Sequence, residues 1–236
     1  MLNFYNLDNE YSFSRFILTT DNKINELLYP IPPVELSKGY EYEWASYFAD
    51  EDDICLDIGC GLAQNLKFYL TTVCKEVYGC DIEDSIEDKI FIGDIIKRYF
   101  GYDCYYKVKD SIENVILNKG DASDLPYCDK KFDKIYCISL LSSIEEDLIE
   151  KSLLEFNRVL KDDGLIIITF DHPKFKVESF SSIINEAGFK FAGDINLDIP
   201  KNAIKTNLNS GITCFRAVIV KNNEVIIESA KIIEES

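Results

Sequence analysis

The sequence predicts an α/β fold, a doubly wound and mostly parallel seven-stranded sheet with helices on both faces. Three observations lead to this prediction. From residue 54 onward, short apolar runs alternate with longer helical patterns. The runs are continuous and punctuated by glycine, as in strands buried on both faces. The last two runs have no helix between them, which predicts an antiparallel edge, whereas the alternating part implies right-handed crossovers.

The predicted strands follow the apolar runs in chain order. They are ICLDI (54–58), EVYGCD (76–81), NVILNKGD (114–121), FDKIYCIS (132–139), GLIIITF (164–170), KFAGDINL (190–197) and GITCFRAVIVKN (211–222). Helical patterns lie at 62–73, 85–100, 145–160 and 179–189. Gly188 is expected to end the last helix, because glycine readily adopts the left-handed conformation found there.

The first 45 or so residues have few strand signals and many aromatic residues. Pro30, Pro32 and Pro33 exclude a helix at that point and favour an extended segment. Residues 34–48 can then form a helix leading into the first strand. Two interpretations stay open: the segment packs across the sheet, or it forms a lid over a pocket at the carboxyl edge of the sheet.

Charge and composition restrict the possible partners. The chain has a formal net charge of -17, from 42 acidic and 25 basic residues, which opposes nucleic-acid binding and favours small cationic ligands. Its apolar runs are far shorter than the ~20 residues of a membrane span, and its N-terminus does not resemble a secretory signal. None of the eight cysteines forms a CxxC pair, and one histidine cannot complete a Cys/His zinc set. Reduced cysteines, a cytoplasmic location and no metal site are therefore expected.

The stretch ICLDIGCGLAQN (54–65) places a glycine-rich turn directly after the first predicted strand. A dinucleotide site requires G-x-G-x-x-G, but Gln64 occupies the third glycine position. Asp57 stands two residues before the first glycine, where its carboxylate would repel a pyrophosphate and suit an amine. The turn therefore favours a cationic ligand over a phosphate.

Two further carboxylates follow later strands. Asp81 ends the second strand, where a carboxylate can accept both hydroxyls of a ribose. Asp121 ends the third strand, where it can accept from an adenine amino group. Each residue can equally serve as a helix cap or a turn residue, so neither is decisive alone.

Taken in order, the motifs LDIGCG, YGCDIE, KGDASDLPY…KKFDKIYC and LLEFNRVLKDDGLIIITF resemble the class I S-adenosylmethionine-dependent methyltransferases. The resemblance is to their broad small-molecule subgroup, the type 11-like methyltransferases, and covers roughly residues 50–220. It implies a Rossmann-like sheet of order 3-2-1-4-5-7-6 with the last strand antiparallel. The expected organisation is an N-terminal segment at 1–48, a possible lid, followed by the cofactor-binding domain at 49–236.

The resemblance also implies a role for individual residues in S-adenosylmethionine binding. Residues of the glycine-rich turn would line the methionine end, and Ser139 would approach the same portion from the fourth strand. Asp81 would hold the ribose hydroxyls, while Ile82 and Ala122 would contact the adenine beside Asp121. The expected cofactor residues are Asp57, Gly59, Cys60, Gly61, Leu62, Asp81, Ile82, Asp121, Ala122 and Ser139.

Three departures from the family pattern affect these expectations. Ala63 replaces a frequent glycine, and the segment between Asp81 and Gly120 is about ten residues longer than usual near the adenine side. Ser142 and Ser143 stand where many relatives have a histidine pair. His172 and Asp171, in the loop after the fifth strand, are the candidates for a general base, although His172 can equally be a loop residue that forms a turn with Pro173.

The expected activity is methyl transfer to a small-molecule acceptor by in-line displacement. The sulfonium is already activated, so positioning can supply about 7–11 kcal/mol of the barrier, and a base is needed only for a protonated nucleophile. Tyr40, Tyr42 and Trp44 would wall the acceptor pocket if the N-terminal segment is a lid. A non-catalytic module that binds S-adenosylmethionine or its product is the alternative, and an NAD-dependent oxidoreductase is less favoured.

Overall fold

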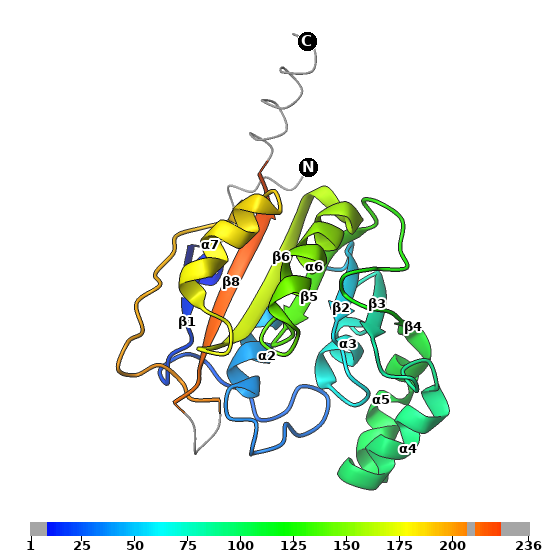
Figure 1. The fold of residues 1–236 in the computed structure, drawn as a ribbon. Helices are drawn as coiled ribbons and strands as arrows, with labels where there is room; N and C mark the ends of the chain where they lie inside the picture. Colours follow the sequence, from blue (N-terminus) through cyan, green and yellow to red (C-terminus); the bar gives the residue numbers. More distant parts are fainter. Residues whose placement is uncertain (1–8, 207–210, 223–236) are drawn as a thin grey trace.

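One twisted sheet runs through the middle of the molecule, and helices cover both of its faces (Figure 1). The structure is a computed structural model that describes residues 9–206 and 211–222. Its strands are β1 (Arg15–Phe16), β2 (Ile54–Ile58), β3 (Glu76–Asp81), β4 (Ile116–Lys119), β5 (Phe132–Ile138), β6 (Leu160–His172), β7 (Phe189–Phe191) and β8 (Thr213–Lys221). Its helices are α1 (Asn9–Ser12), α2 (Lys38–Ser46), α3 (Asn65–Leu70), α4 (Lys89–Phe100), α5 (Tyr102–Asn114), α6 (Glu146–Val159) and α7 (Val177–Glu186).

The strand order confirms the predicted topology. The strands lie in the order β1-β8-β6-β5-β2-β3-β4, with β7 also paired to β8. The five central strands β6, β5, β2, β3 and β4 are parallel to their neighbours, and β8 runs antiparallel to β6. The seven expected strands are all present, and the N-terminal segment adds an eighth, β1.

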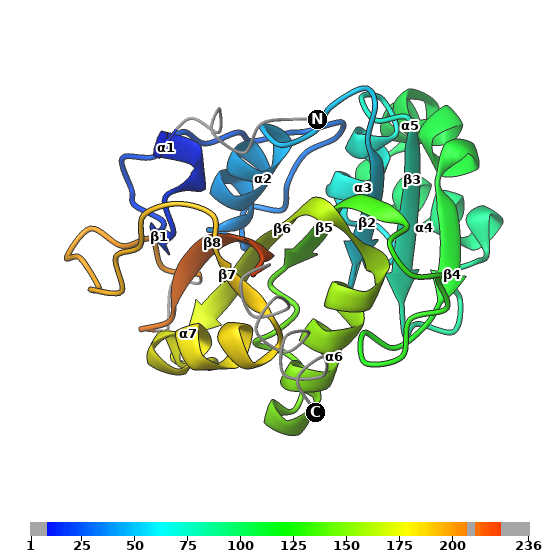
Figure 2. The same cartoon turned by 90° about the horizontal axis from the view of Figure 1, so that it is seen from above.

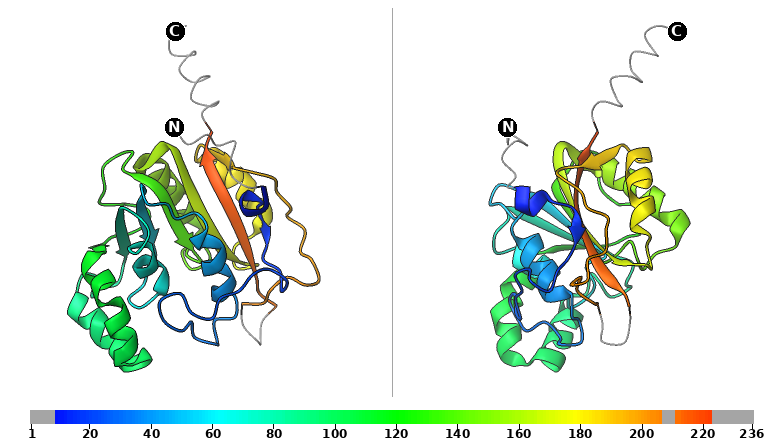
Figure 3. Two further views of the ribbon diagram at one scale, coloured as in Figure 1. Left: turned by 180° about the vertical axis from the view of Figure 1, so that it is seen from behind. Right: turned by 90° about the vertical axis from the view of Figure 1, so that its left-hand side faces the viewer.

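The outer edge of β8 is covered by two short strands that follow one another along it. Arg15 and Phe16 of β1 pair with Arg216 and Phe215, and β7 pairs farther along, where Phe191 lies opposite Ile219. Both views in Figure 3 show the dark blue N-terminal segment beside the orange β8. The predicted strand at 190–197 is therefore limited to three residues, since β1 occupies the rest of the edge.

Two apolar cores, one on each face, show why the sheet is doubly wound. Leu153 of α6 and Phe180 of α7 belong to one buried cluster, whereas Trp44 of α2 and Leu66 of α3 belong to the other. The view from above separates the same helices into two layers (Figure 2). Successive residues of each central strand contribute to opposite clusters, as the continuous apolar runs in the sequence predict.

The segment inserted between Asp81 and Gly120 forms two helices. α4 and α5 are separated by Gly101, which has a φ of +92°, and they pack against each other as a hairpin. The second of these, α5, was not among the helices predicted from the sequence. Among residues 9–206 and 211–222, no helix is both long and apolar enough to cross a membrane.

Candidate functional site

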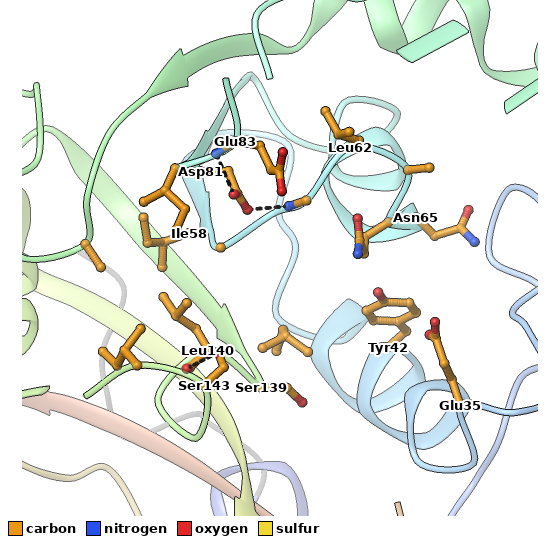
Figure 4. Close-up of a pocket in the computed structure, with 18 of the residues that line it drawn as sticks. Glu35, Tyr42, Ile58, Leu62, Asn65, Asp81, Glu83, Ser139, Leu140 and Ser143 are labelled. Carbon is orange, nitrogen blue, oxygen red and sulfur yellow. Dashed lines mark hydrogen bonds between the residues drawn. The ribbon is translucent and has the colours of Figure 1, made fainter. Parts of the chain in front are cut away.

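A cavity of about 870 Å³ opens at the carboxyl ends of β2, β3 and β5, where an open α/β sheet is expected to bind its ligand. Figure 4 shows Asp81 and Glu83 on one side of it, and Tyr42 and Glu35 on another. Its walls come from the tips of the strands, from α4 and from the N-terminal segment. The described lining residues are Tyr29, Ile31, Pro32, Glu35, Tyr42, Ile58, Gly59, Gly61, Leu62, Ala63, Gln64, Asn65, Asp81, Ile82, Glu83, Ile95, Phe100, Gly120, Asp121, Ala122, Ile138, Ser139, Leu140, Ser143, Ile144, Glu145 and Leu148.

The glycine-rich turn after β2 has a conformation and a tightness that require glycine. Gly59 and Gly61 have φ values of +67° and +55°, which other residues rarely adopt. A Cβ at Gly59 would lie 2.8 Å from Leu140 Cδ1, and one at Gly61 would lie 1.9 Å from Gln64 Oε1. Because these glycines have no side chain, a ligand can approach the backbone of the turn closely.

Asp81 ties the tip of β3 to this turn. Its Oδ2 accepts from the backbone N–H of Gly61 at 2.7 Å, and its Oδ1 accepts from that of Glu83 at 3.1 Å (Figure 4). Each carboxylate oxygen can accept a second hydrogen bond. The carboxylate is therefore fixed in position at the cavity wall and still able to accept two donors from a ligand.

Asp121 is held by its own turn. The backbone N–H and the hydroxyl of Ser123 both donate to its Oδ1, at 2.8 and 2.7 Å. These hydrogen bonds hold the pKa of Asp121 below its ordinary value, so the group is ionised at neutral pH. Both bonds use the same oxygen, which leaves Oδ2 for a ligand.

A buried charged pair lies beneath the turn. The Lys67 ammonium, with no exposed surface, donates to the carbonyls of Cys60 and Gln64 at 2.9 and 3.0 Å. Burial raises the pKa of Asp57 to about 7, although Lys67 acts in the opposite direction, and Asp81 raises it further. Burial likewise lowers the pKa of Lys67. The turn is therefore supported by two buried groups whose pKa values are shifted from their ordinary values.

The N-terminal segment is attached to the start of α3. Asn65 Nδ2 donates to the carbonyl of Tyr29 at 3.0 Å, and Asn65 Oδ1 accepts from the backbone N–H of Tyr29 at 3.3 Å. The Tyr29 hydroxyl donates to the carbonyl of Ala63 at 2.7 Å. Both side chains are buried, so these hydrogen bonds position the extended segment as a wall of the cavity.

A second buried network joins α2 to the tips of β5 and β6. The Lys38 ammonium donates to Ser139 Oγ at 2.7 Å and to Glu41 Oε2 at 3.1 Å. Ser139 Oγ in turn donates to Glu41 Oε2 at 2.8 Å, and the hydroxyl of Thr169 donates to the same oxygen. Glu41 has no exposed surface, and its Oε1 has no hydrogen-bond partner among the described residues.

This network stabilises an unusual backbone conformation at the cavity wall. Ser139 has a φ of +61°, which costs a non-glycine residue on the order of 1–3 kcal/mol. Its N–H donates to the carbonyl and the hydroxyl of Thr169, at 2.9 and 3.1 Å. Burial alone would raise the pKa of Glu41, but Lys38 and the hydroxyl donors outweigh it and hold that pKa below its ordinary value. Glu41 and Lys38 therefore form a buried ion pair.

The structure brings most of the predicted cofactor residues together. Eight of them line the cavity: Gly59, Gly61, Leu62, Asp81, Ile82, Asp121, Ala122 and Ser139. The other two are buried and are not among the lining residues: Asp57 belongs to β2, and Cys60 lies between the two glycines of the turn.

The predicted catalytic and acceptor residues are more scattered. Asp171 accepts from Lys174 at 3.0 Å, and neither it nor His172 lines the cavity. Both belong to the β6–β8 ladder, and the ring of His172 packs against Phe16. Tyr42 lines the cavity, whereas Tyr40 and Trp44 line a small surface hollow on the far side of α2.

Several site residues were not predicted from the sequence. Glu35, Lys38 and Glu41 reach the site only through the folding of the N-terminal segment onto β5 and β6. Lys67 lies within a predicted helix and has no motif of its own. Its one signal in the sequence is a lysine among the apolar residues of the helix NLKFYL, six residues after the second glycine of the turn. Lysine is almost never fully buried without partners, so a lysine in such a stretch indicates a specific role.

Comparisons with known proteins agree with this geometry. Residues 56–168 match the family described as methyltransferase domain. The matched region, just under half of the chain, is similar to a methyltransferase domain. An uncharacterised protein of Methanocaldococcus jannaschii is 31% identical over 119 residues, which span 50% of this chain and 37% of that protein.

Solved structures share the fold of this chain. A TehB-like S-adenosylmethionine-dependent methyltransferase of Corynebacterium glutamicum superposes with a TM-score of 0.53 at 19% identity, over 77% of this chain and 86% of that one. An S-adenosylmethionine-dependent methyltransferase of Aquifex aeolicus gives 0.51 at 18% identity, over 76% and 87%. Both of these proteins are described as S-adenosylmethionine-dependent methyltransferases, and at these identities their likeness to this chain concerns the fold.

Proposed function

We propose that the protein binds S-adenosylmethionine in this cavity and transfers its methyl group to a small-molecule acceptor. The observation that carries the proposal is the arrangement of Asp81 and Asp121 around the turn of Gly59 and Gly61. Two fixed carboxylates beside a turn with close backbone approach suit the ribose and adenine of a nucleoside. Tyr42 and Gln64, which also line the cavity, can donate to the carboxylate of the methionine portion.

The charge of the cavity supports S-adenosylmethionine over a dinucleotide. The described lining residues include five carboxylates, Glu35, Asp81, Glu83, Asp121 and Glu145, and no lysine, arginine or histidine. S-adenosylmethionine brings a sulfonium and an ammonium, which these carboxylates attract. The pyrophosphate of NAD would meet like charges without a cationic partner, and a polyanionic nucleic-acid acceptor is disfavoured for the same reason.

Isothermal titration calorimetry with S-adenosylmethionine, S-adenosylhomocysteine and NAD tests the cofactor. The first two are expected to bind and NAD is not. Incubation with a panel of amine, phenol and thiol acceptors then tests turnover through the release of S-adenosylhomocysteine. Binding without release over the whole panel would favour the non-catalytic module instead.

Proton removal from the acceptor, where it is needed, is best assigned to Glu35. This residue lines the cavity opposite Asp81 and Glu83, and its side chain lies beside Tyr42 (Figure 4). Burial raises the pKa of Glu35, and the charge of Glu41 raises it further against the influence of Lys38. A carboxyl with a raised pKa is a better proton acceptor than an ordinary one. Asp171 and His172 remain the sequence-based alternative for this role.

Three variants separate these assignments. Glu35→Gln is expected to lower kcat by about 100-fold or more for a protonated acceptor, without weakening cofactor binding. Glu145→Gln, at another exposed carboxylate of the same cavity, is the matched control and should keep most of the rate. His172→Ala should also keep it, and a loss of rate in His172→Ala alone would return the role to His172 at the end of β6.

The N-terminal segment completes the acceptor side of the cavity. Tyr29, Ile31, Pro32, Glu35 and Tyr42 all line it, and residues 1–8 of the expected segment 1–48 lie outside the described residues. A lid function for this segment stays a prediction. Amide hydrogen exchange over residues 27–45 should slow when S-adenosylhomocysteine is bound, and unchanged exchange would indicate a permanent wall.

A further inference from the structure

A second polar cluster lies on the opposite edge of the sheet, away from the cavity. Asp53 precedes β2, Cys55 is its second residue, and Cys74 precedes β3. One carboxylate oxygen and the two Sγ atoms all lie within 4.8 Å of one another, and all three residues are buried. Their spacing in the sequence matches no metal-binding motif, so only the fold brings them together.

The separation of the two sulfurs fits metal ligands better than a disulfide. Cys55 Sγ lies 3.5 Å from Cys74 Sγ. A disulfide requires about 2.05 Å, whereas two sulfurs about 2.3 Å from one tetrahedral zinc ion are about 3.8 Å apart. A carboxylate beside the pair is a normal third zinc ligand and would do nothing for a disulfide.

The remaining contacts leave the ligand atoms available. The Lys134 ammonium and the backbone N–H of Asp50 both donate to Asp53 Oδ2, so Oδ1 is left for a metal. Two thiolates, Asp53 and Lys134 carry a combined charge of -2, which one divalent cation neutralises.

An unsatisfied buried group faces the same cluster. The Tyr136 hydroxyl has no hydrogen-bond partner among the described residues, and the side chain has no exposed surface. Tyr136 belongs to the same buried cluster of side chains as Cys55 and Cys74. Tyr136 and Lys134 alternate with Ile135 on β5, so both face the same side of the sheet as Cys55. An unpaired buried hydroxyl is costly, and a metal-bound water or the metal itself would satisfy it.

We propose that Asp53, Cys55 and Cys74 form a binding site for a thiophilic divalent cation such as Zn²⁺, with the Tyr136 hydroxyl or a water at the fourth position. Binding releases two protons from the thiols to solvent. The site lies at the amino edge of the sheet and is separate from the cofactor cavity. It ties the start of β2 to the loop before β3, and its role is structural.

Cobalt titration of the reduced, chelator-stripped full chain tests the site. Co²⁺ takes the same tetrahedral ligands, and its thiolate charge-transfer and visible bands report them directly. One equivalent is expected to bind with these bands, and Zn²⁺ should displace it. Absence of a thiolate charge-transfer band would overturn the proposal, as would an intact mass showing that the reduced preparation holds this pair as a disulfide.

Substitutions test which residues bind the Co²⁺ ion and produce these bands. Cys74→Ser should weaken Co²⁺ binding by about 100-fold or more, since losing even a group that only supports a ligand costs about 10–100-fold. Cys104→Ser and Cys128→Ser, at cysteines outside the cluster, are matched controls and should bind like the unaltered chain. Asp53→Asn gives a second route if Cys74→Ser fails to fold. Bands that persist in both Cys74→Ser and Asp53→Asn would refute the site.

Discussion

We call the tips of β2, β3 and β4, where the cofactor is proposed to bind, the donor half of the site, and the N-terminal segment with the tips of β5 and β6 the acceptor half. These two halves are built from contacts of very different range along the chain. On the donor half, Asp81 bonds to Gly61 at a separation of 20 residues, and Asp121 bonds to Ser123 at a separation of 2. On the acceptor half, Glu41 bonds to Ser139 and Thr169 at separations of 98 and 128. The donor half is thus fixed by strand tips and their own turns, whereas the acceptor half depends on the docking of the N-terminal segment.

This difference explains what could be predicted from the sequence. The turn of Gly59 and Gly61, Asp81 and Asp121 are local motifs, so they were identified and lie at the cavity. Glu41 and Lys38 stand in an ordinary helical stretch, and no periodicity indicates that they meet Ser139. The same reasoning applies to the fold. The long central strands were predicted, while β1, two residues long, exists only because β8 offers it an edge.

Removing the Lys38 ammonium from the acceptor half should have the largest effect on the free energy of unfolding. Lys38→Met leaves the Glu41 carboxylate buried without its counter-ion, which typically costs about 3–5 kcal/mol in unfolding free energy. Urea denaturation followed by circular dichroism measures this. Lys119→Met removes an exposed lysine paired with Asp84 and should leave the denaturation midpoint unchanged. Equal midpoints for both variants would show that the acceptor half does not depend on the buried pair.

Removing the central carboxylate of the donor half should affect binding more than folding. Asp81→Ala deletes the carboxylate that we propose accepts two ribose hydroxyls, and at about 1.5–3 kcal/mol for each charged hydrogen bond the affinity for S-adenosylmethionine should fall about 100-fold or more. Asp84→Ala, three residues later and outside the cavity lining, is the control. Isothermal titration calorimetry measures the affinity of both variants for S-adenosylmethionine. A small loss of affinity in Asp81→Ala would show that the ribose binds elsewhere.

The buried carboxyl of Asp57, in the donor half, should make both stability and cofactor binding depend on pH. Burial raises the pKa of Asp57 to about 7 from an ordinary value of 3.8. The folded chain therefore holds this proton more tightly than the unfolded chain does. Its contribution to stability is greatest below pH 3.8 and is lost as the pH rises through 7.

Cofactor affinity should change in the opposite direction, because an ammonium prefers the ionised carboxylate. The affinity for S-adenosylmethionine should rise roughly tenfold between about pH 6 and pH 8 as Asp57 ionises. Asp57→Asn should flatten this profile. A steep profile in Asp57→Asn would assign the titration to another group.

The attachment of the N-terminal segment to α3 should give the smallest effect. Tyr29→Phe removes the hydrogen bond to the carbonyl of Ala63 and keeps the buried ring, so the loss should be about 1 kcal/mol in unfolding free energy. Tyr99→Phe, at an exposed tyrosine of α4, should change nothing measurable. If Tyr29→Phe also weakens cofactor binding by more than its stability loss, the two halves of the cavity are coupled through this contact.

The pairing of β1 with β8 has a consequence for the behaviour of the protein in solution. An open strand edge is a template for pairing with another molecule, and short strands are one way in which proteins protect such edges. Here β1 and β7 share the outer edge of β8, and each leaves only two or three residues facing outward. By covering this edge, β1 protects the chain against self-association. Removing β1 would leave Phe215 and Arg216 with open backbone groups, where a second copy could add a strand.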